Sequence, residues 1–133
     1  MLPSAVDLGV NVRIRSRAVA VELHCARNSY HRLTVQLLAD RFDVGRGAIL
    51  KAAKTERWRN VEHLLRASRT LHVAVELERS SRGADAIAQS LHFGTPSAVH
   101  HHVKRETGLT IRQLKFEGAL KIAAELWRRR GLD

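Results

Sequence analysis

The sequence predicts an all-α protein with two helix-turn-helix units joined by a long connector helix. Apolar residues recur at three- and four-residue steps through most of the chain beyond residue 30, as on the buried faces of helices. Two segments also repeat one plan, which is a short helix, a break and a second short helix that carries basic residues. Because 44% of the residues are hydrophobic but only 5% are aromatic, helices packed through Leu, Val, Ile and Ala suit the composition.

The N-terminal segment 1–30 has the least regular pattern. Val10, Val12 and Ile14 alternate with polar residues, which suits a short strand, but a basic arm is an equal alternative because a lone strand has no partner. The apolar run from Arg17 to Arg27 fits a strand or a helix, and we favour the helix. We therefore assign residues 1–30 to an N-terminal arm and a first helix.

The segment 31–57 is the first predicted helix-turn-helix unit. Its first helix places four apolar side chains on one face, namely Leu33, Leu37, Leu38 and Phe42. Asp43-Val44-Gly45 breaks this pattern, which resumes in the second helix at Ile49, Ala52 and Ala53. Residues 58–78 then form the predicted connector helix, which ends in the turn-forming sequence ERSSRG.

The segment 83–116 repeats this plan as the second unit. Its first helix buries Ile87, Ala88 and Leu91, and His92-Phe93-Gly94 forms the break. Thr95 is suited to cap the next helix, with Pro96 as the first helical residue.

A final amphipathic helix is expected to follow. Gly108 ends the preceding helix and Thr110 caps the final one. The apolar face of this helix includes Leu114, Leu120, Leu126 and Trp127. The part beyond the second unit is assigned to residues 117–133.

The charge balance points to a polyanionic partner. The chain has 23 Lys and Arg against 13 Asp and Glu, a net charge of +10 and a pI near 11.2. Nucleic acid is the first expectation and an anionic membrane surface the second. The single Cys25 forms no internal disulfide, and arginines interrupt the apolar run that a signal peptide needs. We therefore expect a reduced, cytoplasmic protein with no membrane span.

Catalytic and metal-binding patterns are weak or missing. The sequence has no glycine-rich phosphate loop, nucleophile elbow or His-Glu-x-x-His pattern, so we expect no enzyme and no cofactor. His24, Cys25 and His31 suggest zinc only weakly, because one cysteine lacks a paired spacing. Adjacent helical residues point about 100° apart, so the three histidines at 100–102 do not chelate one ion. We expect no metal.

The length of the connector suits DNA. A helix from about residue 59 to 77 is roughly 28 Å long, and successive major-groove faces on one side of DNA lie about 34 Å apart. Allowing for the width of the flanking helices, one chain can place both second helices in adjacent major grooves.

The sequence IAQSLHFGTPSAVHHHVKRETGLTIRQLK carries a resemblance to a known family. Residues from about 31 to 116, and this part most closely, resemble the AraC/XylS-type DNA-binding domain of transcriptional regulators. The matching positions are Ile87, Ala88, Phe93, Ser97, Lys104, Arg105, Gly108 and Thr110. Arg69 and Leu77 fall at the family's spacings in the connector. The resemblance implies two homeodomain-like three-helix subdomains, and the chain is too short to add an effector domain.

The sequence also departs from the family pattern. His92 stands where the turn usually has Gly, and Val99 and Val103 replace two aromatic residues. Ile111 replaces a Pro. In the first unit Ala53 replaces an aromatic residue and Trp58 a Gly, so the first unit is the more degenerate one.

Two short helices supply the candidate DNA-binding residues. On the second-unit helix Val99 and Val103 face the core and His102 packs beside them, so the outward positions line one stripe. The second-unit candidates are Thr95, Ser97, His100, His101, Lys104, Arg105 and, in the next helix, Arg112. The first-unit candidates are Arg46, Gly47, Leu50, Lys51 and Lys54. Basic and polar side chains of this kind read base edges or bind phosphates, and Leu50 suits a thymine methyl.

These expectations combine into one functional hypothesis. The protein is a sequence-specific transcriptional regulator that reads two adjacent major-groove segments of double-stranded DNA. It acts in the bacterial cytoplasm, at the nucleoid. The alternative is a protein-interaction module on the same scaffold, a partner or antagonist of a transcription complex with little DNA binding of its own. The N-terminal segment or the C-terminal helix is the candidate surface for a homodimer or another protein.

Overall fold

The computed structural model describes residues 18–25, 28, 33–79 and 83–130, and these form an all-helical structure without a strand. Residues 18–25 are helical, which confirms the preference for a helix there. The strand or arm expected around residues 10–14 lies outside the described residues. The helices are α2 (Val35–Phe42), α3 (Arg46–Thr55), α4 (Val61–Arg79), α5 (Ala84–Ser90), α6 (Pro96–Thr107), α7 (Ile111–Glu117) and α8 (Ala119–Arg128).

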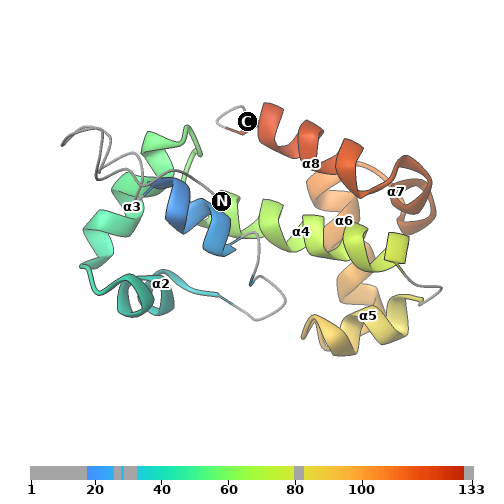
Figure 1. Ribbon diagram of the computed structural model, residues 1–133. Helices are drawn as coiled ribbons and strands as arrows, with labels where there is room; N and C mark the ends of the chain where they lie inside the picture. The colour runs from blue at the N-terminus through green and yellow to red at the C-terminus, as the bar shows by residue number, and fades with distance from the viewer. Residues whose placement is uncertain (1–17, 26–27, 29–32, 80–82, 131–133) are drawn as a thin grey trace.

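Helix α4 forms the axis of the molecule. It crosses the centre of the view in Figure 1, with α2 and α3 at one end, α5, α6 and α7 toward the other end, and α8 running alongside it. It packs against α3, α6, α7 and α8, while α2 packs on α3 and α5 on α6. The two pairs of short helices are therefore held apart by one continuous helix.

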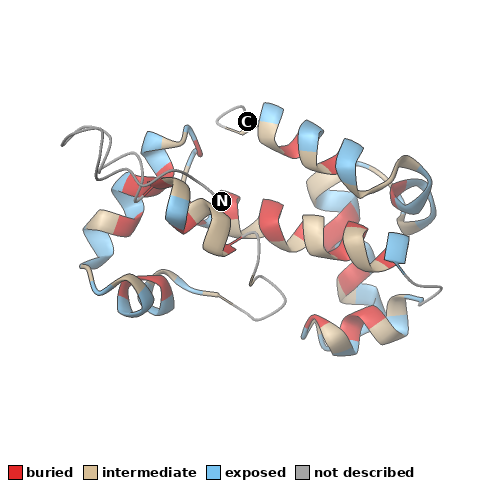
Figure 2. Ribbon diagram, viewed as in Figure 1, coloured by how far each residue is buried: buried red, intermediate tan, exposed pale blue. Residues whose placement is uncertain are grey.

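The buried face of α4 changes along its length. Val61, Leu64 and Ser68 are buried in the N-terminal half, and at about 100° per residue they share one side of the helix. Val73 and Leu77, buried in the C-terminal half, lie on roughly the opposite side. Buried positions accordingly mark α4 along its whole length in Figure 2. One helix thus contributes to the core of both ends of the molecule.

The helix ends follow the capping residues in the sequence. The Thr95 side chain accepts a hydrogen bond from the Ala98 backbone N–H, and Pro96 is the first residue of α6. Gly108 ends α6 at φ 75°, in the left-handed region that favours glycine. Thr110 and Gln113 form a reciprocal capping box at the start of α7. The predicted start and end of α6 and the predicted start of α7 are confirmed.

Two predictions about packing are wrong. The expected single final helix is split into α7 and α8 at Gly118, whose φ of 88° and ψ of 152° no helix permits. Leu37, expected on the buried face of α2, is 51% exposed, because that face is occupied by Leu38 and Ala39. The connector helix begins at Val61, three residues later than expected, and Trp58 lies in the turn before it.

The Trp58 indole joins distant parts of the chain. It is buried, and its Nε1 donates a hydrogen bond of 2.5 Å to Oε2 of Glu22 in the first helix. The rings of Trp58 and Trp127 of α8 make an edge-to-face contact with centroids 5.1 Å apart. Such pairs add to the stabilisation from burial alone. Trp58 therefore ties both the N-terminal helix and α8 to the start of α4.

Replacing Trp58 should test this tie. Trp58→Ala is expected to lower the free energy of unfolding by about 3–5 kcal/mol, because it leaves a cavity at the junction of three helices. Urea denaturation measures the change. Phe116→Ala is the matched control, since Phe116 is 91% exposed and its loss should change stability by at most about 0.5 kcal/mol. Equal effects of the two substitutions would contradict the assigned role of Trp58.

His92 occupies a strained backbone position. Its φ is 58°, in the left-handed region, at the position where the AraC/XylS-type pattern has a glycine. A side chain there costs roughly 1–2 kcal/mol, part of which is offset by the greater flexibility of glycine in the unfolded chain.

His92→Gly is therefore expected to raise the free energy of unfolding by about 0.5–1 kcal/mol, because it relieves this strain. The same substitution at His101, an exposed position inside α6, should lower it by roughly 0.5 kcal/mol. Thermal and urea unfolding of both variants measure whether the free energy of unfolding rises or falls in each. A loss of stability in both variants would refute the strain at His92.

Candidate nucleic-acid interface

Helix α6 exposes a polar stripe and buries its apolar side. Val99 and Val103 are completely buried, as predicted from their four-residue spacing. The side chains at the outward candidate positions are exposed: Thr95, Ser97, His100, His101, Lys104 and Arg105. Hydroxyl, imidazole and ammonium groups of this kind donate or accept hydrogen bonds at base edges and phosphates. The surface of α6 is chemically able to contact nucleic acid.

Some of these side chains already have partners within the protein. The Thr95 hydroxyl serves as the α6 cap, and Lys104 Nζ donates to the Gly108 carbonyl at 3.1 Å. Arg105 Nε lies 3.1 Å from Oε2 of Glu106. These contacts hold the three side chains near the ends of α6. To bind another molecule, each side chain must share its present partner or give it up.

His102 differs from its two neighbours because it is buried. Its Nε2 lies 2.8 Å from Oγ1 of Thr70 in α4. The same hydroxyl donates to the Arg66 carbonyl at 2.8 Å, so the imidazole N–H is the donor in the contact with Thr70. Burial lowers the pKa of His102 from 6.5 to about 4. The prediction that His102 packs inside is confirmed, and it is neutral at pH 7.

Helix α3 has the corresponding arrangement in the first half of the chain. Ile49, Ala52 and Ala53 are buried. The outward candidates Arg46, Gly47, Leu50, Lys51 and Lys54 are all exposed, with Leu50 at 45%. A Cβ added at Gly47 would meet no atom within 4 Å, so internal packing does not require glycine there. The exposed side of α3 is cationic with one aliphatic side chain.

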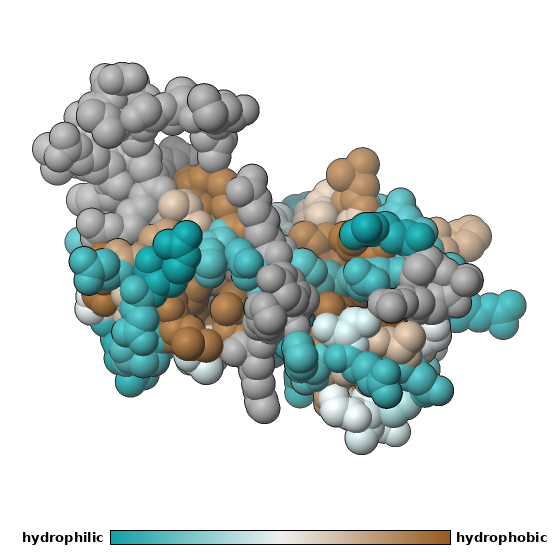
Figure 3. Space-filling view, turned by 60° about the horizontal axis from the view of Figure 1, so that its bottom comes forward, coloured by the Kyte–Doolittle hydropathy of each residue, from teal (hydrophilic) through white to brown (hydrophobic). Residues whose placement is uncertain are grey.

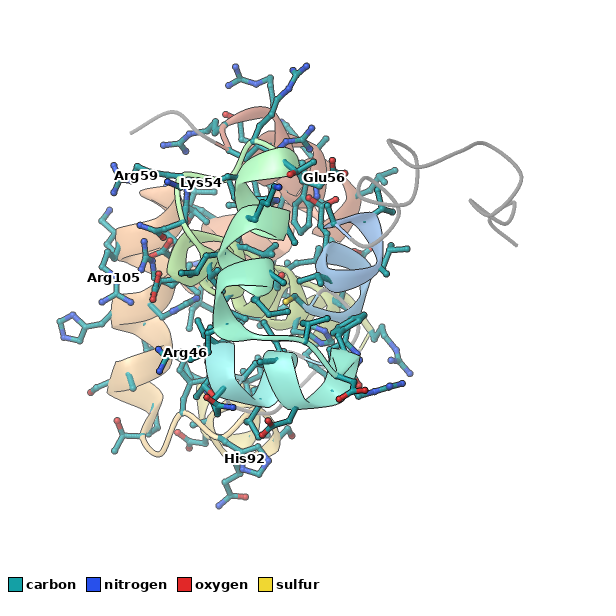
Figure 4. All side chains as sticks on the ribbon, turned by 90° about the vertical axis from the view of Figure 1, so that its left-hand side faces the viewer. Arg46, Lys54, Glu56, Arg59, His92 and Arg105 are labelled. Atoms are coloured by element: carbon teal, nitrogen blue, oxygen red, sulfur yellow. The ribbon has the colours of Figure 1, made fainter. Side chains whose placement is uncertain are left out.

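Three basic residues of α3 and α6 lie on the same side of the molecule. In Figure 4, Arg46 and Lys54 of α3 and Arg105 of α6 are on one side of the view. Arg59 is on that side too, whereas Glu56 is on the opposite side. The space-filling view in Figure 3 shows hydrophilic side chains over both halves of the molecule, with patches of hydrophobic side chains among them in each half. The two short helices present cations in a common direction.

Arg112 occupies a different surface. It is exposed in the first turn of α7 and lines a hollow with Leu109 and Phe116. Of the second-unit candidates, Arg112 is the one that lies in α7.

Residues in α4 that were not among the predicted site residues position α6. Arg69 donates to the Leu91 carbonyl at 2.6 Å, and its guanidinium lies 3.9 Å from the centroid of the Phe93 ring. Phe93 in turn meets His102 edge to face at 5.2 Å. Arg66 Nε lies 3.3 Å from Oε2 of Glu106 on α6. Only the family spacing of Arg69 hinted at these contacts in the sequence.

The structure also bears on whether the described residues could bind a metal ion or cross a membrane. Within residues 18–25, 28, 33–79 and 83–130, no group of three or more His, Cys, Asp or Glu side chains is placed to hold a metal ion. His31 of the weak zinc pattern lies outside these residues, and burial raises the pKa of the Cys25 thiol to about 12. None of the described helices has the length and apolar character to cross a membrane.

Comparison of the chain with protein-family models, with curated proteins and with solved structures found no match. The site therefore has to be interpreted from its own geometry and chemistry.

The buried His102 makes stability depend on pH. Its pKa is lower in the folded protein than in the unfolded chain, so the unfolded chain binds more protons between pH 6.5 and about 4. The stability present at pH 7 is therefore lost as the pH falls through this window, by up to about 3 kcal/mol. His102→Gln should flatten the decrease, and His101→Gln should leave it unchanged. Urea unfolding of the wild type and the two variants at pH 7.0, 6.0 and 5.0 measures how the free energy of unfolding of each depends on pH. The same pH dependence in all three proteins would contradict the role given to His102.

Proposed function

We propose that the protein is a sequence-specific DNA-binding transcriptional regulator that reads two adjacent major-groove segments with α3 and α6. The observation that carries the proposal is that these two helices, which both pack on α4, place Arg46 and Lys54 of α3 and Arg105 of α6 on the same side of the molecule. In this proposal α2–α3 and α5–α6 are two helix-turn-helix units of the AraC/XylS type, each completed by a third helix in a homeodomain-like arrangement.

The dimensions of α4 support two contacts by one chain. Its 19 residues span about 28 Å, and adjacent major-groove faces are about 34 Å apart. The thickness of the flanking helices accounts for the difference. A single chain then contacts two groove segments, which most helix-turn-helix proteins achieve as dimers.

The charge of the chain supports the same partner. A net charge of +10 attracts the phosphate backbone from a distance and supplies affinity for any sequence. Discrimination between sequences is assigned to side chains at base edges, which are Ser97, His100 and Lys104 on α6 and Arg46 and Lys51 on α3. Leu50 is suited to a thymine methyl group, and Arg112 to a phosphate. Such a regulator acts on the nucleoid of a bacterial cytoplasm.

A protein-interaction module on the same scaffold is the second candidate. It is favoured by two large apolar side chains that lie open near the junction of α7 and α8, Phe116 at 91% and Leu120 at 85% exposure. Exposed apolar surface is typical of contacts with other proteins. In this candidate the α7–α8 junction binds a homodimer partner or a transcription complex, and α3 and α6 bind little DNA.

Selection of duplex DNA from a random-sequence pool decides between the two candidates. A regulator should enrich one motif that spans about two helical turns, because each of α3 and α6 reads one groove segment. Lack of enrichment would reject the regulator and favour the interaction module.

Variants assign the two halves of the motif. His100→Ala or Lys104→Ala should change the preferred bases in one half, and Lys51→Ala in the other, because lost base contacts cost about 1–3 kcal/mol each. Arg112→Ala should weaken binding to all sequences alike. Lys121→Ala on α8 removes the same charge and should leave both affinity and preference nearly unchanged. Gel shifts at one fixed salt concentration measure these effects, and equal losses for Lys104→Ala and Lys121→Ala would count against α6 as a reading helix.

A further inference from the structure

Four arginines surround a cleft where α4, α6 and α8 meet. The cleft has a volume of about 470 Å³. Arg66 comes from α4 and Arg105 from α6, while Arg59 lies just before α4 and Arg129 directly after α8. Figure 4 shows Arg59 and Arg105 on the same side of the molecule. Residues far apart in the sequence thus bring their guanidinium groups to one place.

The cleft is lined by more arginines than carboxylates. Among its lining residues, Glu106 is the one carboxylate, against four guanidinium groups. Its side chain is 11% exposed, and Oε2 lies 3.3 Å from Nε of Arg66 and 3.1 Å from Nε of Arg105. The side chains of Arg66 and Arg105 are 36% and 65% exposed, so their guanidinium groups are also accessible to solvent. Those groups are the ones that bind a phosphate or carboxylate in a bidentate manner.

A further polar group lies in the wall of the cleft. The Nδ1 atom of His63 is buried, and it has no hydrogen-bond partner within the described part of the chain. Buried polar atoms are nearly always paired in folded proteins, so such an atom beside a cleft indicates a missing partner. The Ala67 and Leu126 side chains complete the wall of the cleft.

We propose that this arginine cleft binds a multiply charged phosphate group, such as a diphosphate. Several guanidinium groups from separate helices match the several oxygens of such a group, and a volume of about 470 Å³ has room for it. Binding draws Arg129 at the end of α8 toward α4 and α6, so the anion holds α8 in place. The phosphate is either that of a small phosphorylated molecule or that of a nucleic-acid backbone, since the recognition chemistry is the same.

Titration of the full-length chain with sodium pyrophosphate at constant ionic strength tests the cleft without DNA. Calorimetry should show saturable binding to the wild type. Arg59→Gln with Arg129→Gln should weaken it about tenfold or more, because hydrogen bonds to charged groups are lost. Arg57→Gln with Arg130→Gln is the matched control, since these arginines also lie just before α4 and after α8 but line a different hollow. The control pair removes the same charge and should stay within about twofold of the wild type.

The outcomes separate the cleft from a general effect of charge. Absence of saturable binding, or equal weakening in both double variants, would overturn the proposal. If Arg59→Gln with Arg129→Gln lowers the thermal stability by itself, Arg129→Gln alone is measured and should still weaken pyrophosphate binding at least about threefold.

Duplex DNA then distinguishes the two sources of phosphate. If pyrophosphate competes with DNA and the Arg59/Arg129 variant loses DNA affinity, the cleft binds the nucleic-acid backbone. If pyrophosphate binds without competing, the cleft takes a free phosphorylated molecule. Either result supports a phosphate site, and neither depends on whether α3 and α6 select a sequence.

Discussion

The burial of α4 along two opposite sides is the constraint on which the rest of the structure depends. A helix that buries one stripe organises one core, whereas α4 buries Val61 and Leu64 on one side and Val73 and Leu77 on the other. Both ends of the molecule pack on the same helix. The orientation of α3 relative to α6 therefore depends on the angle between the two buried faces around the axis of α4. Between Val35 and Arg79 the chain is helical except for the short segments 43–45 and 56–60.

The attachment of α6 to α4 combines packing with buried polar contacts. Thr70 and His102 form a hydrogen bond inside the interface, and Arg69 binds the carbonyl of Leu91 at the end of α5. Because a buried hydrogen bond is directional and costly to leave unpaired, it favours the rotation of α6 in which His102 faces Thr70. The exposed stripe of α6 is therefore oriented by the side chains on its hidden face. This is why His102, although adjacent to His100 and His101, belongs to the scaffold.

The sequence predicted local features well and distant ones poorly. Thr95, Gly108 and Thr110 mark helix ends because capping depends on a few neighbouring residues. The four-residue spacing of valines in α6 likewise revealed its hidden side. The separation of α7 from α8 at Gly118 was missed, because the apolar spacing continues across the break. The contact of Arg69 with Leu91, 22 residues away, follows from the tertiary packing and leaves no periodic pattern. The arginine cleft was missed for the same reason.

The pairing of Trp58 with Trp127 has a spectroscopic consequence. The chain contains two tryptophans, and these two rings are in edge-to-face contact at the seam between the first helix, the start of α4 and α8. Tryptophan fluorescence of this protein therefore originates from this one pair of rings, beside the Glu22 carboxylate. The tryptophan emission depends on the packing of the first helix, the start of α4 and α8 against one another. Binding to the exposed side chains of α6 is not expected to change it directly. A change of emission on adding a ligand accordingly signals movement of α8 or of the N-terminal helix.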